Sequence, residues 1–491
     1  MSELIQTEKK RIESLLQSDE IKTISSQFAY HNKQLFIVGG AIRDCILDNE
    51  CHDYDFCTDA TPDEIKSIIS TIGKSIYCIG EKFGTIGLIF KNQKKDLPIL
   101  NCEFTTFRKD TYENQSRNPS IEYSTLEEDL ARRDFTINSL ACSLCAADYG
   151  RIVDNYRGIY DIRERIIRAV GTSDDRILED PLRILRAIRF SVLLNFEIDP
   201  LFEVSIKKLY KRMRILSNER IKDEFVKMIR SETPSIAIRK MIDYNISEYV
   251  VPEINDMLDV EQPLEYHTKN VFEHTMSVLD QVENQEDLRL AALYHDVGKP
   301  ATQTISEDGI IHFIGHESVS CDIARASMTN LRFPNHMITR VCFLVKHHMD
   351  FLGYNISVRK ITDAAIRRLI LKTTYIVANE EIINTEYLLK LVRADITSSN
   401  SQKVRFRLEY LNEFEKKLKD LREKENVTKL KSPLDGNELM KMFDLQEGIW
   451  IGKVKDYLVE QIIEGNLKEE DYEKASSLSI KYVNDNYSYL L

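Results

Sequence analysis

The chain has 491 residues, 43% of them hydrophobic, and a formal net charge of −12, which predicts about three packed domains and argues against indiscriminate coating of nucleic acid. No apolar run approaches the roughly 20 residues of a membrane helix, and the start of the chain lacks the apolar stretch of a signal peptide. The nine cysteines show no paired spacing, so we expect reduced thiols in a cytoplasmic protein without a membrane partner.

Residues 1–150 are predicted to form an α+β head with a small mixed sheet. Residues 1–30 have the periodicity of an amphipathic leading helix, and short β-rich runs lie within 35–60 and 76–107. Residues 108–123 are polar and contain Asn118-Pro119. We therefore predict a mobile loop over 108–123.

Two carboxylates in the head follow a glycine turn. The apolar residues 36–38 end at Gly39-Gly40, and Asp53 and Asp55 stand on a predicted second strand. Strand residues two apart point the same way, so both carboxylates face one side. Glycines let the backbone approach a phosphate, and paired carboxylates hold divalent metal against a triphosphate. On its own, however, such a pair is more often an exposed turn or strand edge.

Two further residues complete this candidate site for nucleotide transfer. Arg43 lies four residues after the glycines, within reach of the phosphates. Glu103, in the run N-C-E-F-T-T-F, is the candidate for a third catalytic carboxylate beside Asp53 and Asp55. Metal ions would supply the electrostatic stabilisation, and the expected ion is Mg²⁺.

Residues 151–255 are predicted to form an all-α neck rich in arginine. In E-D-P-L-R-I-L-R-A-I-R-F (179–190), Arg183, Arg186 and Arg189 fall three apart, and Asp180 precedes the first by three. On a helix these side chains share a slowly turning face. An Asp and an Arg projecting together can hydrogen-bond a base edge, and further arginines suit phosphates. A surface ion-pair ladder is the alternative.

Residues 256–400 are predicted to be helical and contain a second constellation. Adjacent His295-Asp296, with His274 and Asp395 at a distance, suits a divalent first-row metal. The pattern resembles the HD phosphohydrolase superfamily. The resemblance implies that these four residues are ligands of a divalent metal, and that three more histidines would extend the site towards a second metal: His316, His347 and His348. Packed or exposed histidines on an inert scaffold are the alternative.

Residues 401–491 are charged and are predicted to form a helical C-terminal tail. Gly448 and Gly452 flank Trp450, the only tryptophan, and Lys453 follows. The segment is compatible with a packed helical hairpin and with an RNA contact near Lys453.

Taken in order, the head and neck motifs resemble those of the class II tRNA nucleotidyltransferases, the CCA-adding enzymes of the poly(A) polymerase superfamily. The resemblance covers roughly residues 30–230. It depends on G-G-A-I-R-D, D-Y-D, R-R-D-F-T-I-N (132–138), D-N-Y-R-G-I-Y-D (154–161), E-D-P-L-R and S-N-E-R-I-K-D-E (217–224).

The resemblance implies addition of C, C and A to the 3′ end of tRNA from CTP and ATP without a nucleic-acid template. Carried over by position, it assigns roles to the following residues: Gly40 and Arg43 contact the nucleotide, Asp53 and Asp55 the magnesium, Arg133 and Asp134 the sugar or phosphates, Asp180 and Arg183 the base edge, and Arg186 and Arg189 support that pair. Residues 108–123 take the place of the family's flexible loop, although Q-S-R-N-P departs from its commoner form.

Other functions stay open to different degrees. Poly(A) synthesis shares the head chemistry, but residues 76–107 lack the G-[RK]-R-F type of segment found in bacterial poly(A) polymerases. Partial addition of CC or A is disfavoured by the segment 108–123. An HD phosphohydrolase with an inert head is disfavoured because the head carboxylates and arginines are all present. The oligomeric state is left open.

Overall fold

The computed structural model describes residues 4–51, 53–70, 72, 75–80, 84–90, 100–111, 120–262, 270–350, 362–377, 380–383, 385–396, 401–424 and 430–487. Contacts divide the chain into two compact units, Met1–Pro252 and Glu253–Leu491. The division lies close to the predicted boundary at 255/256, whereas the finer division into head, neck, HD region and tail stays a prediction. Among the described helices, none combines the length and the apolar character needed to cross a membrane.

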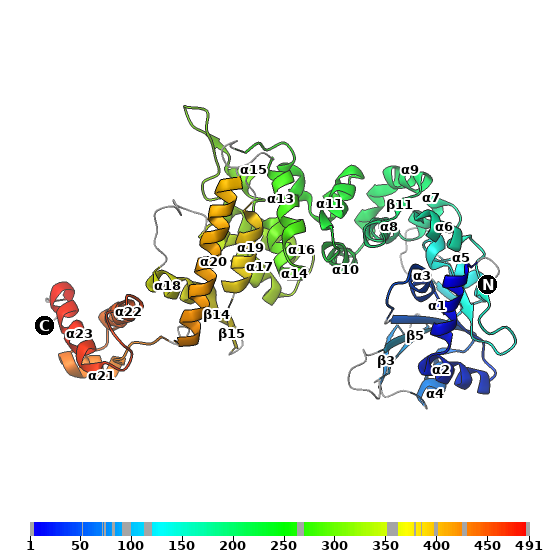
Figure 1. The fold of residues 1–491 in the computed structure, drawn as a ribbon, viewed down its shortest axis with the longest axis horizontal. Helices are drawn as coiled ribbons and strands as arrows, with labels where there is room; N and C mark the ends of the chain where they lie inside the picture. The colour runs from blue at the N-terminus through cyan, green and yellow to red at the C-terminus, as the bar shows by residue number, and fades with distance from the viewer. Residues whose placement is uncertain are drawn as a thin grey trace. The chain divides into compact units, whose positions relative to one another are not determined.

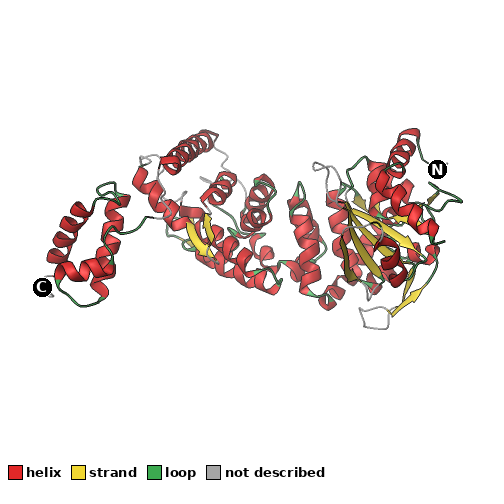
Figure 2. Cartoon of the chain, turned by 90° about the horizontal axis from the view of Figure 1, so that it is seen from below, coloured by secondary structure: helices red, strands yellow, loops and turns green. Residues whose placement is uncertain are grey.

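The N-terminal unit is built on one mixed sheet (Figure 1, Figure 2). The strands lie in the order β3-β4-β5-β2-β1-β8-β9. Only β2 and β5 pair in parallel, and all other neighbours are antiparallel. Their bounds are β1 (Leu35–Val38), β2 (Asp53–Thr58), β3 (Ser75–Gly80), β4 (Thr85–Phe90), β5 (Leu100–Thr106), β8 (Ala141–Ser143) and β9 (Ile152–Val153). The predicted α+β fold with a small mixed sheet is confirmed.

The leading segment forms two helices, not the single helix predicted. The first ends at Leu16, and Ser18 caps the second by accepting a hydrogen bond from the backbone N–H of Ile21 (3.4 Å). With α3 and α4 they pack around the sheet. The bounds are α1 (Gln6–Leu16), α2 (Asp19–Tyr30), α3 (Gly40–Leu47) and α4 (Pro62–Ser70).

Alternation along β2 separates a core face from a polar face. Phe56 stacks on Phe104 of β5, with ring centroids 4.8 Å apart, and Phe104 stacks on Phe28 of α2 at 5.4 Å. All three rings are buried. Asp53 and Asp55 stand on the opposite side of the strand and are exposed. The aromatic core thus fixes the direction in which the two carboxylates point.

The segment predicted as a loop is only partly irregular. Its two ends form the antiparallel hairpin strands β6 (Arg108–Thr111) and β7 (Ser120–Tyr123). The prediction of a loop over the whole of 108–123 is therefore wrong at both ends. Residues 112–119, including Asn118-Pro119, lie outside the described residues.

The neck is largely helical, as predicted, but a short parallel pair interrupts it. Helix α5 (Leu126–Ala131) still belongs to the head. The helices of the neck are α6 (Gly158–Glu164), α7 (Ser173–Glu179), α8 (Leu182–Leu193), α9 (Pro200–Leu209), α10 (Asn218–Ile229), α11 (Pro234–Asp243) and α12 (Ser247–Val250), and its strands are β10 (Ile166–Ile167) and β11 (Glu197–Ile198). Asp180 was predicted to share a helix with the arginines. It lies instead at the α7–α8 junction with extended backbone (φ −143°, ψ 102°), because Pro181 disfavours helical backbone in the preceding residue.

Gly158, at the start of α6, packs directly against another backbone. A Cβ at this position would lie 2.3 Å from the carbonyl oxygen of Thr136. We expect Gly158→Ala to destabilise the protein by about 1–3 kcal/mol through overpacking, as measured by denaturant unfolding followed by circular dichroism. Gly452, in a helix with no atom within 4 Å of its added Cβ, is the control: Gly452→Ala should raise stability by up to about 1 kcal/mol. Equal effects of the two substitutions would contradict this packing.

The C-terminal unit is helical, as predicted, with two added hairpins. Its helices are α13 (Val271–Gln281), α14 (Glu286–Tyr294), α15 (Lys299–Thr302), α16 (His316–Asn330), α17 (Asn335–His347), α18 (Asp363–Thr373), α19 (Thr385–Asp395), α20 (Ser401–Lys424), α21 (Gly436–Phe443), α22 (Ile449–Ile463) and α23 (Tyr472–Tyr487). The hairpin strands are β12 (Thr304–Ile305), β13 (Ile311–His312), β14 (Thr374–Val377) and β15 (Glu380–Ile383).

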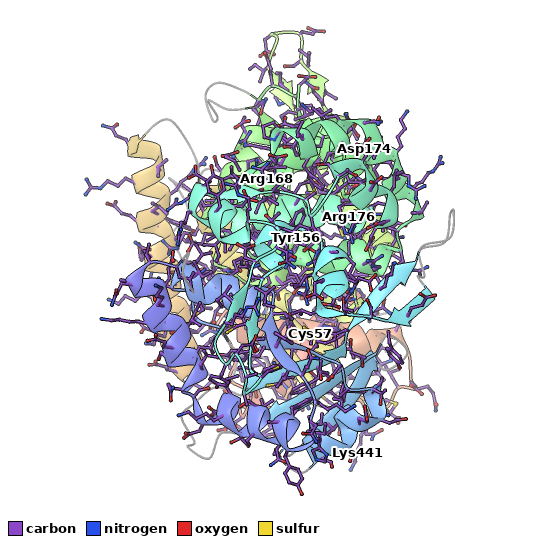
Figure 3. All side chains as sticks on the ribbon, turned by 90° about the vertical axis from the view of Figure 1, so that its right-hand side faces the viewer. Cys57, Tyr156, Arg168, Asp174, Arg176 and Lys441 are labelled. Carbon is purple, nitrogen blue, oxygen red and sulfur yellow. The ribbon has the colours of Figure 1, made fainter. Side chains whose placement is uncertain are left out.

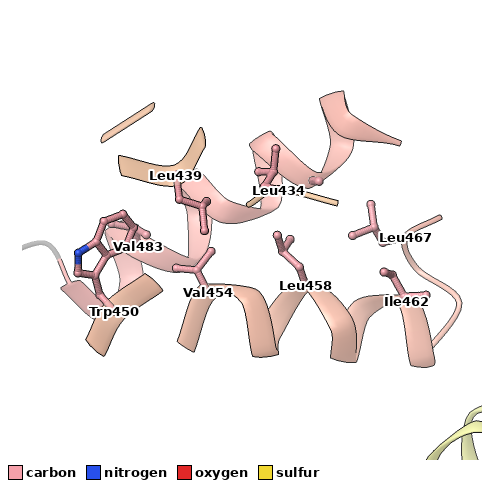
Figure 4. Close-up of a cluster of buried hydrophobic side chains, with 9 residues drawn as sticks. Leu434, Leu439, Trp450, Val454, Leu458, Ile462, Leu467 and Val483 are labelled. Carbon is pink, nitrogen blue, oxygen red and sulfur yellow. The ribbon is translucent and has the colours of Figure 1, made fainter. Parts of the chain in front are cut away.

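The tail has its own apolar core around Trp450 (Figure 4). Trp450 is 4% exposed, meets Phe443 edge to face at 5.7 Å, and donates its indole N–H to the carbonyl oxygen of Gln446 (3.1 Å). These contacts describe a packed helical element, the first of the two alternatives for this segment. Lys453 is exposed on α22, and an RNA contact there stays a prediction.

Candidate functional site

A cavity of about 870 Å³ in the N-terminal unit collects eleven of the twelve residues predicted for nucleotide transfer. Its walls come from the β1–α3 turn, β2, the segment after α5, and helices α8 and α10. The predicted residues that line it are Gly39, Gly40, Arg43, Asp53, Asp55, Arg133, Asp134, Asp180, Arg183, Arg186 and Arg189. Glu103 is the twelfth and is not among the lining residues.

Two features of the structure require glycine at position 39: its backbone conformation and the close approach of a neighbouring side chain. Gly39 has φ +70°, a conformation that side chains rarely adopt, and a Cβ there would lie 2.9 Å from Nη1 of Arg133. Gly40 begins α3, so the turn presents the N-terminus of that helix to the cavity. The turn therefore brings backbone close to Arg133 and leaves room for an anion.

The three predicted carboxylates lie on neighbouring strands. Asp55 of β2 is the register partner of Glu103 on the parallel strand β5. Solvent reaches Asp55 only through the cavity, and the surrounding walls desolvate its carboxylate and raise its pKa; the Arg133 charge lowers this pKa, and the Asp53 charge raises it. Desolvation also raises the pKa of Glu103, and the charges of Asp55 and Asp53 add to the effect. Such mutual repulsion is relieved by a divalent cation, so the donor set fits Mg²⁺.

Arg43 is held by protein groups. Its Nε and Nη2 donate to the two carboxylate oxygens of Asp44 (2.9 Å each), and its Nη1 donates to Oδ1 of Asn138 (2.6 Å). The guanidinium also lies 5.1 Å from the ring centroid of Phe190. Arg43 is 8% exposed. Its predicted contact with the nucleotide would therefore be made by a side chain already fixed in place.

Arg133 is fixed by a buried acid that sequence reasoning missed. Asp129, fully buried, accepts from Nη2 of Arg133 (3.2 Å) and from Nη2 of Arg132 (2.6 Å). Burial raises the pKa of Asp129, but the two guanidinium groups outweigh it and lower the pKa overall. The i,i+3 and i,i+4 spacing of Asp129 to the arginine pair was the available signal.

Asp134 is the centre of a polar cluster within the cavity wall. Its Oδ2 accepts from Nε of Arg186 (2.7 Å), and its Oδ1 accepts from Nδ2 of Asn138 (3.1 Å) and from the backbone N–H of Phe135 (2.8 Å). Burial raises the pKa of Asp134, but Arg186 and the hydrogen bonds outweigh it and hold the pKa at about 2. The carboxylate thus positions Arg186.

The depressed pKa of Asp134 makes its contribution to stability depend on pH. A folded pKa of about 2 against the ordinary 3.8 corresponds to about 2 kcal/mol, present above about pH 4 and lost as pH falls towards 2. We expect Asp134→Asn to lower the unfolding free energy by that amount at pH 7 and by progressively less below pH 4. Asp63→Asn, whose side chain is 94% exposed, serves as control. A deficit that stays constant from pH 7 to pH 3 would contradict the assignment.

Asp180 and Arg183 both line the cavity, and different hydrogen-bond partners hold their side chains in place. Arg183 donates through Nη1 to the carbonyl oxygen of Arg176 (2.9 Å; Arg176 is labelled in Figure 3) and through Nη2 to that of Arg132 (2.8 Å). Asp180 accepts from both Nη groups of Arg220 on α10, at 2.6 and 3.3 Å. The two predicted base readers are thus oriented separately.

A second acid that sequence reasoning missed supports Arg186 and Arg189. Glu224 of α10 is 4% exposed. It pairs with Nε of Arg189 (2.7 Å) and lies 3.9 Å from Nη1 of Arg186. Arg189 also lies 4.2 Å from the ring centroid of Phe190. The segment 217–224 contributed to the family resemblance, but which of its side chains enter the cavity depends on how α10 packs on α8.

In the C-terminal unit, six of the seven predicted HD residues form two adjacent groups. His274, His295 and Asp395 make the first group, and Asp296, His316 and His348 the second; within each, the potential ligand atoms lie within 4.8 Å of one another. All six residues are buried. Both groups fit a divalent first-row metal.

Asp296 joins the two groups. Its Oδ2 lies 3.2 Å from Nε2 of His295 and 3.4 Å from Nε2 of His274. Its Oδ1 lies 3.3 Å from Nε2 of His316 and 3.8 Å from Nε2 of His348. One carboxylate oxygen thus faces each group, as required of a carboxylate that bridges two metal ions.

Backbone carbonyls orient three of the four histidines. Nδ1 of His295, His316 and His348 donates to the carbonyl oxygen three residues earlier, at 2.8, 2.7 and 2.6 Å. With Nδ1 engaged in this way, Nε2 is the ring nitrogen that faces the carboxylates and is the one available to a metal. The imidazole groups are therefore oriented as metal ligands.

The two carboxylates of this cluster, Asp296 and Asp395, govern the charge of the groups around them. Burial lowers the pKa of His295, but Asp296 and Asp395 outweigh it and raise the pKa to about 10. Burial lowers the pKa of His348 to about 4, with the charge of His295 acting in the same direction. Lys299, 7% exposed, donates to Oδ2 of Asp296 (2.6 Å). The positive charges of Lys299 and His295 thus lie beside the Asp296 carboxylate.

His347 lies outside both groups. Its Nδ1 pairs with Oδ2 of Asp350 (2.8 Å), and its ring packs on Phe343 at 4.5 Å. The structure therefore does not bring His347 to the second metal group, whereas it does bring His316 and His348 there.

Three family models match the chain. Residues 35–168 match the poly A polymerase head domain, residues 195–258 the probable RNA and SrmB-binding site of polymerase A, and residues 264–394 the HD domain. The order of the three matches agrees with the order of motifs read from the sequence.

Individual relatives agree with these matches. A CCA-adding enzyme of Lactobacillus helveticus is 37% identical over 219 residues, 44% of this chain and 51% of that enzyme. A CC-adding tRNA nucleotidyltransferase of Thermus thermophilus is 28% identical over 455 residues, 90% of this chain and 93% of that enzyme. The alignment thus spans about half the length of the first relative and nearly all of the second.

Solved structures share the fold. A Bacillus stearothermophilus CCA-adding enzyme in complex with CTP superposes with a TM-score of 0.67 at 21% identity, over 95% of this chain and 97% of that chain. With the three family matches in this order, the chain is similar to the class II tRNA nucleotidyltransferases of the poly(A) polymerase superfamily, and its residues 264–394 match the HD domain.

Proposed function

We propose that the chain adds C, C and A to the 3′ end of tRNA without a nucleic-acid template, using CTP and ATP. The observation that carries the proposal is the single cavity in which the β2 carboxylates, the glycine turn and the arginines of α8 meet. The relatives named CCA-adding enzymes support the substrates. The free thiols in the described part of the chain accord with action in the cytoplasm.

Asp53 and Asp55 would hold Mg²⁺, which when bound supplies charge stabilisation for the triphosphate and the attacking hydroxyl. Arg133 lies beside the glycine turn and acts on the charge of Asp55, and its guanidinium suits phosphate or sugar oxygens there. Asp180 would accept from the exocyclic amine of C or A, and Arg183 would donate to the adjacent ring nitrogen. The arrangement selects C and A over U and G, whose edges carry the opposite pattern.

Partial addition is the main rival, because a relative that aligns with 90% of the chain is a CC-adding tRNA nucleotidyltransferase. A tRNA transcript that ends before CCA, incubated with all four nucleoside triphosphates, tests the proposal. Sequencing should show C, C and A added in that order, with little U or G. Products that end in CC would favour the CC-adding alternative, and long A tails a poly(A) polymerase.

We also propose that the HD centre hydrolyses phosphoesters with divalent metal. Asp296, with one oxygen towards each of the two groups, favours this second function. His274, His295 and Asp395 would hold one ion and His316 with His348 the other, and bound metal would supply Lewis-acid activation of the ester. Assays with Mn²⁺ and 2′,3′-cyclic nucleotides test this. A lack of hydrolysis together with a lack of bound metal would refute it.

A further inference from the structure

We infer that Arg220 is a specificity-determining residue that positions the Asp180 carboxylate for base recognition. The inference rests on the proposed nucleotide addition and goes beyond it, because it names a residue on another helix that sets the choice of base. Arg220 lies in the first turn of α10, which packs along α8. Its side chain lines the same cavity as Asp180 and Arg183.

Asp180 needs an external anchor because its backbone provides little constraint. It stands between α7 and α8 with extended backbone, outside either helix. The local anchor is one hydrogen bond, in which the backbone N–H of Leu182 donates to Oδ1 (3.1 Å). The bidentate pair with Arg220, 40 residues away in sequence, supplies the second. A planar guanidinium on both carboxylate oxygens fixes the plane of the carboxylate as well as its position.

The pairing leaves capacity for a base. A carboxylate has about four acceptor sites. Within the described part of the chain, Oδ1 accepts from Leu182 and Arg220, and Oδ2 accepts from Arg220 at 2.6 Å. One site on Oδ2 therefore remains for a donor from the cavity. The amines of C and A can fill it, whereas the carbonyls that U and G present there face an acceptor.

Arg183, the proposed donor to the base, is anchored in a comparable way. Two backbone carbonyls and the carboxylate of Glu179 hold its guanidinium, the last at 2.6 Å from Nη1. Arg220 holds the hydrogen-bond acceptor, Asp180, in place, just as these groups hold the hydrogen-bond donor, Arg183. Without Arg220, Asp180 can turn to accept from other donors, and the fixed spacing between acceptor and donor is lost.

A purely structural role for Arg220 would have a different signature. The side chain is 39% exposed and Asp180 23%, and an ion pair this accessible to solvent contributes little to stability. Arg220→Ala is therefore expected to fold. Lys222, on the same helix, pairs with Asp223 and does not line the cavity, so Lys222→Ala is the matched control.

The test compares Arg220→Ala, Arg220→Lys, Asp180→Ala and the double variant with the wild-type protein. We measure kcat/KM for CTP and UTP on a tRNA transcript lacking CCA. In parallel, equilibrium binding of CTP and UTP is measured by calorimetry without tRNA. Arg220→Ala should lower the CTP-to-UTP ratio about 5- to 150-fold, the range for one base-reading contact. Asp180→Ala should do the same, and the double variant should add little.

Each outcome of this test either supports or overturns the role of Arg220 in base selection. An unchanged CTP-to-UTP ratio in a folded Arg220→Ala protein, or equal losses for both nucleotides, would overturn the inference. If circular dichroism shows that the alanine variant is unfolded, Arg220→Lys, which keeps the charge and loses the bidentate geometry, gives the same comparison. A wild-type protein that adds no nucleotide would refute the proposed function, and the binding ratio would still decide the role of Arg220. Equal binding of CTP and UTP by the wild-type protein would overturn the inference.

Discussion

Replacing Asp53 by alanine is expected to abolish addition of every nucleotide to every tRNA primer. Asp53 and Asp55 stand on the polar face of β2 and line the cavity. Metal ions stabilise the transition state of such reactions by several kcal/mol, and each 1.36 kcal/mol changes the rate tenfold. The rate of addition should therefore fall by at least about 10³-fold. The measurement is single-nucleotide extension of tRNA primers that end before CCA, after C and after CC, with each nucleotide offered separately.

The controls separate this loss from misfolding and from loss of selectivity. Asp53 is exposed and accepts from Nδ2 of Asn101 (3.0 Å), so Asp53→Ala should unfold at the same denaturant concentration as the wild-type protein. Asp63→Asn, in the same unit but outside the cavity, should keep full activity. An Asp53→Ala protein that still adds C at more than about a tenth of the normal rate would show that this carboxylate does not hold the reactive metal.

Replacing Asp296 by asparagine is expected to remove divalent metal from both HD groups at once. Each oxygen of Asp296 faces a different group, so one substitution weakens both. We expect metal affinity and phosphoester hydrolysis to fall by about 100-fold or more. Even the loss of a group that only hydrogen-bonds a metal ligand lowers metal affinity or activity about 10- to 100-fold. The measurement is metal content per chain by mass spectrometry after loading with Mn²⁺ and gel filtration.

Two neighbouring histidines give a matched comparison for Asp296. His348→Ala should reduce metal content in the second group only, whereas His347→Ala should leave it unchanged, because His347 pairs with Asp350 outside both groups. Addition of nucleotides to tRNA should stay normal in all three variants, since these residues belong to the C-terminal unit. Unchanged metal content in Asp296→Asn, or a loss in His347→Ala, would contradict the bridging arrangement.

Local pattern predicted the polar face of β2 and most of the HD ligands. Alternation along a strand places Asp53 and Asp55 together regardless of the rest of the fold. Likewise, the residues of the HD signature were identified by type and order, and the structure places six of the seven within two groups. The α+β head with a helical remainder also follows from periodicity.

Features that depend on packing between distant segments were not predictable in the same way. The carboxylate of Asp180 meets Arg220 from another helix, and the buried acids Asp129 and Glu224 pair with arginines that line the cavity. Asp180 was placed on a helix because the arginine spacing continues back to it, and Pro181 overrode that spacing. His347 and His348 are adjacent in sequence, but consecutive helical residues point about 100° apart, so His348 reaches the metal group whereas His347 pairs with Asp350.

The most direct test of complete CCA addition is a tRNA transcript that already ends in CC, offered ATP alone. The proposed single pocket, in which Asp180 and Arg183 read the shared edge of C and A, predicts addition of one A followed by arrest. Failure to add A, with normal addition of C to a transcript that lacks CCA, would show a CC-adding enzyme. A run of many A residues would show a poly(A) polymerase, and either result would contradict the proposed function.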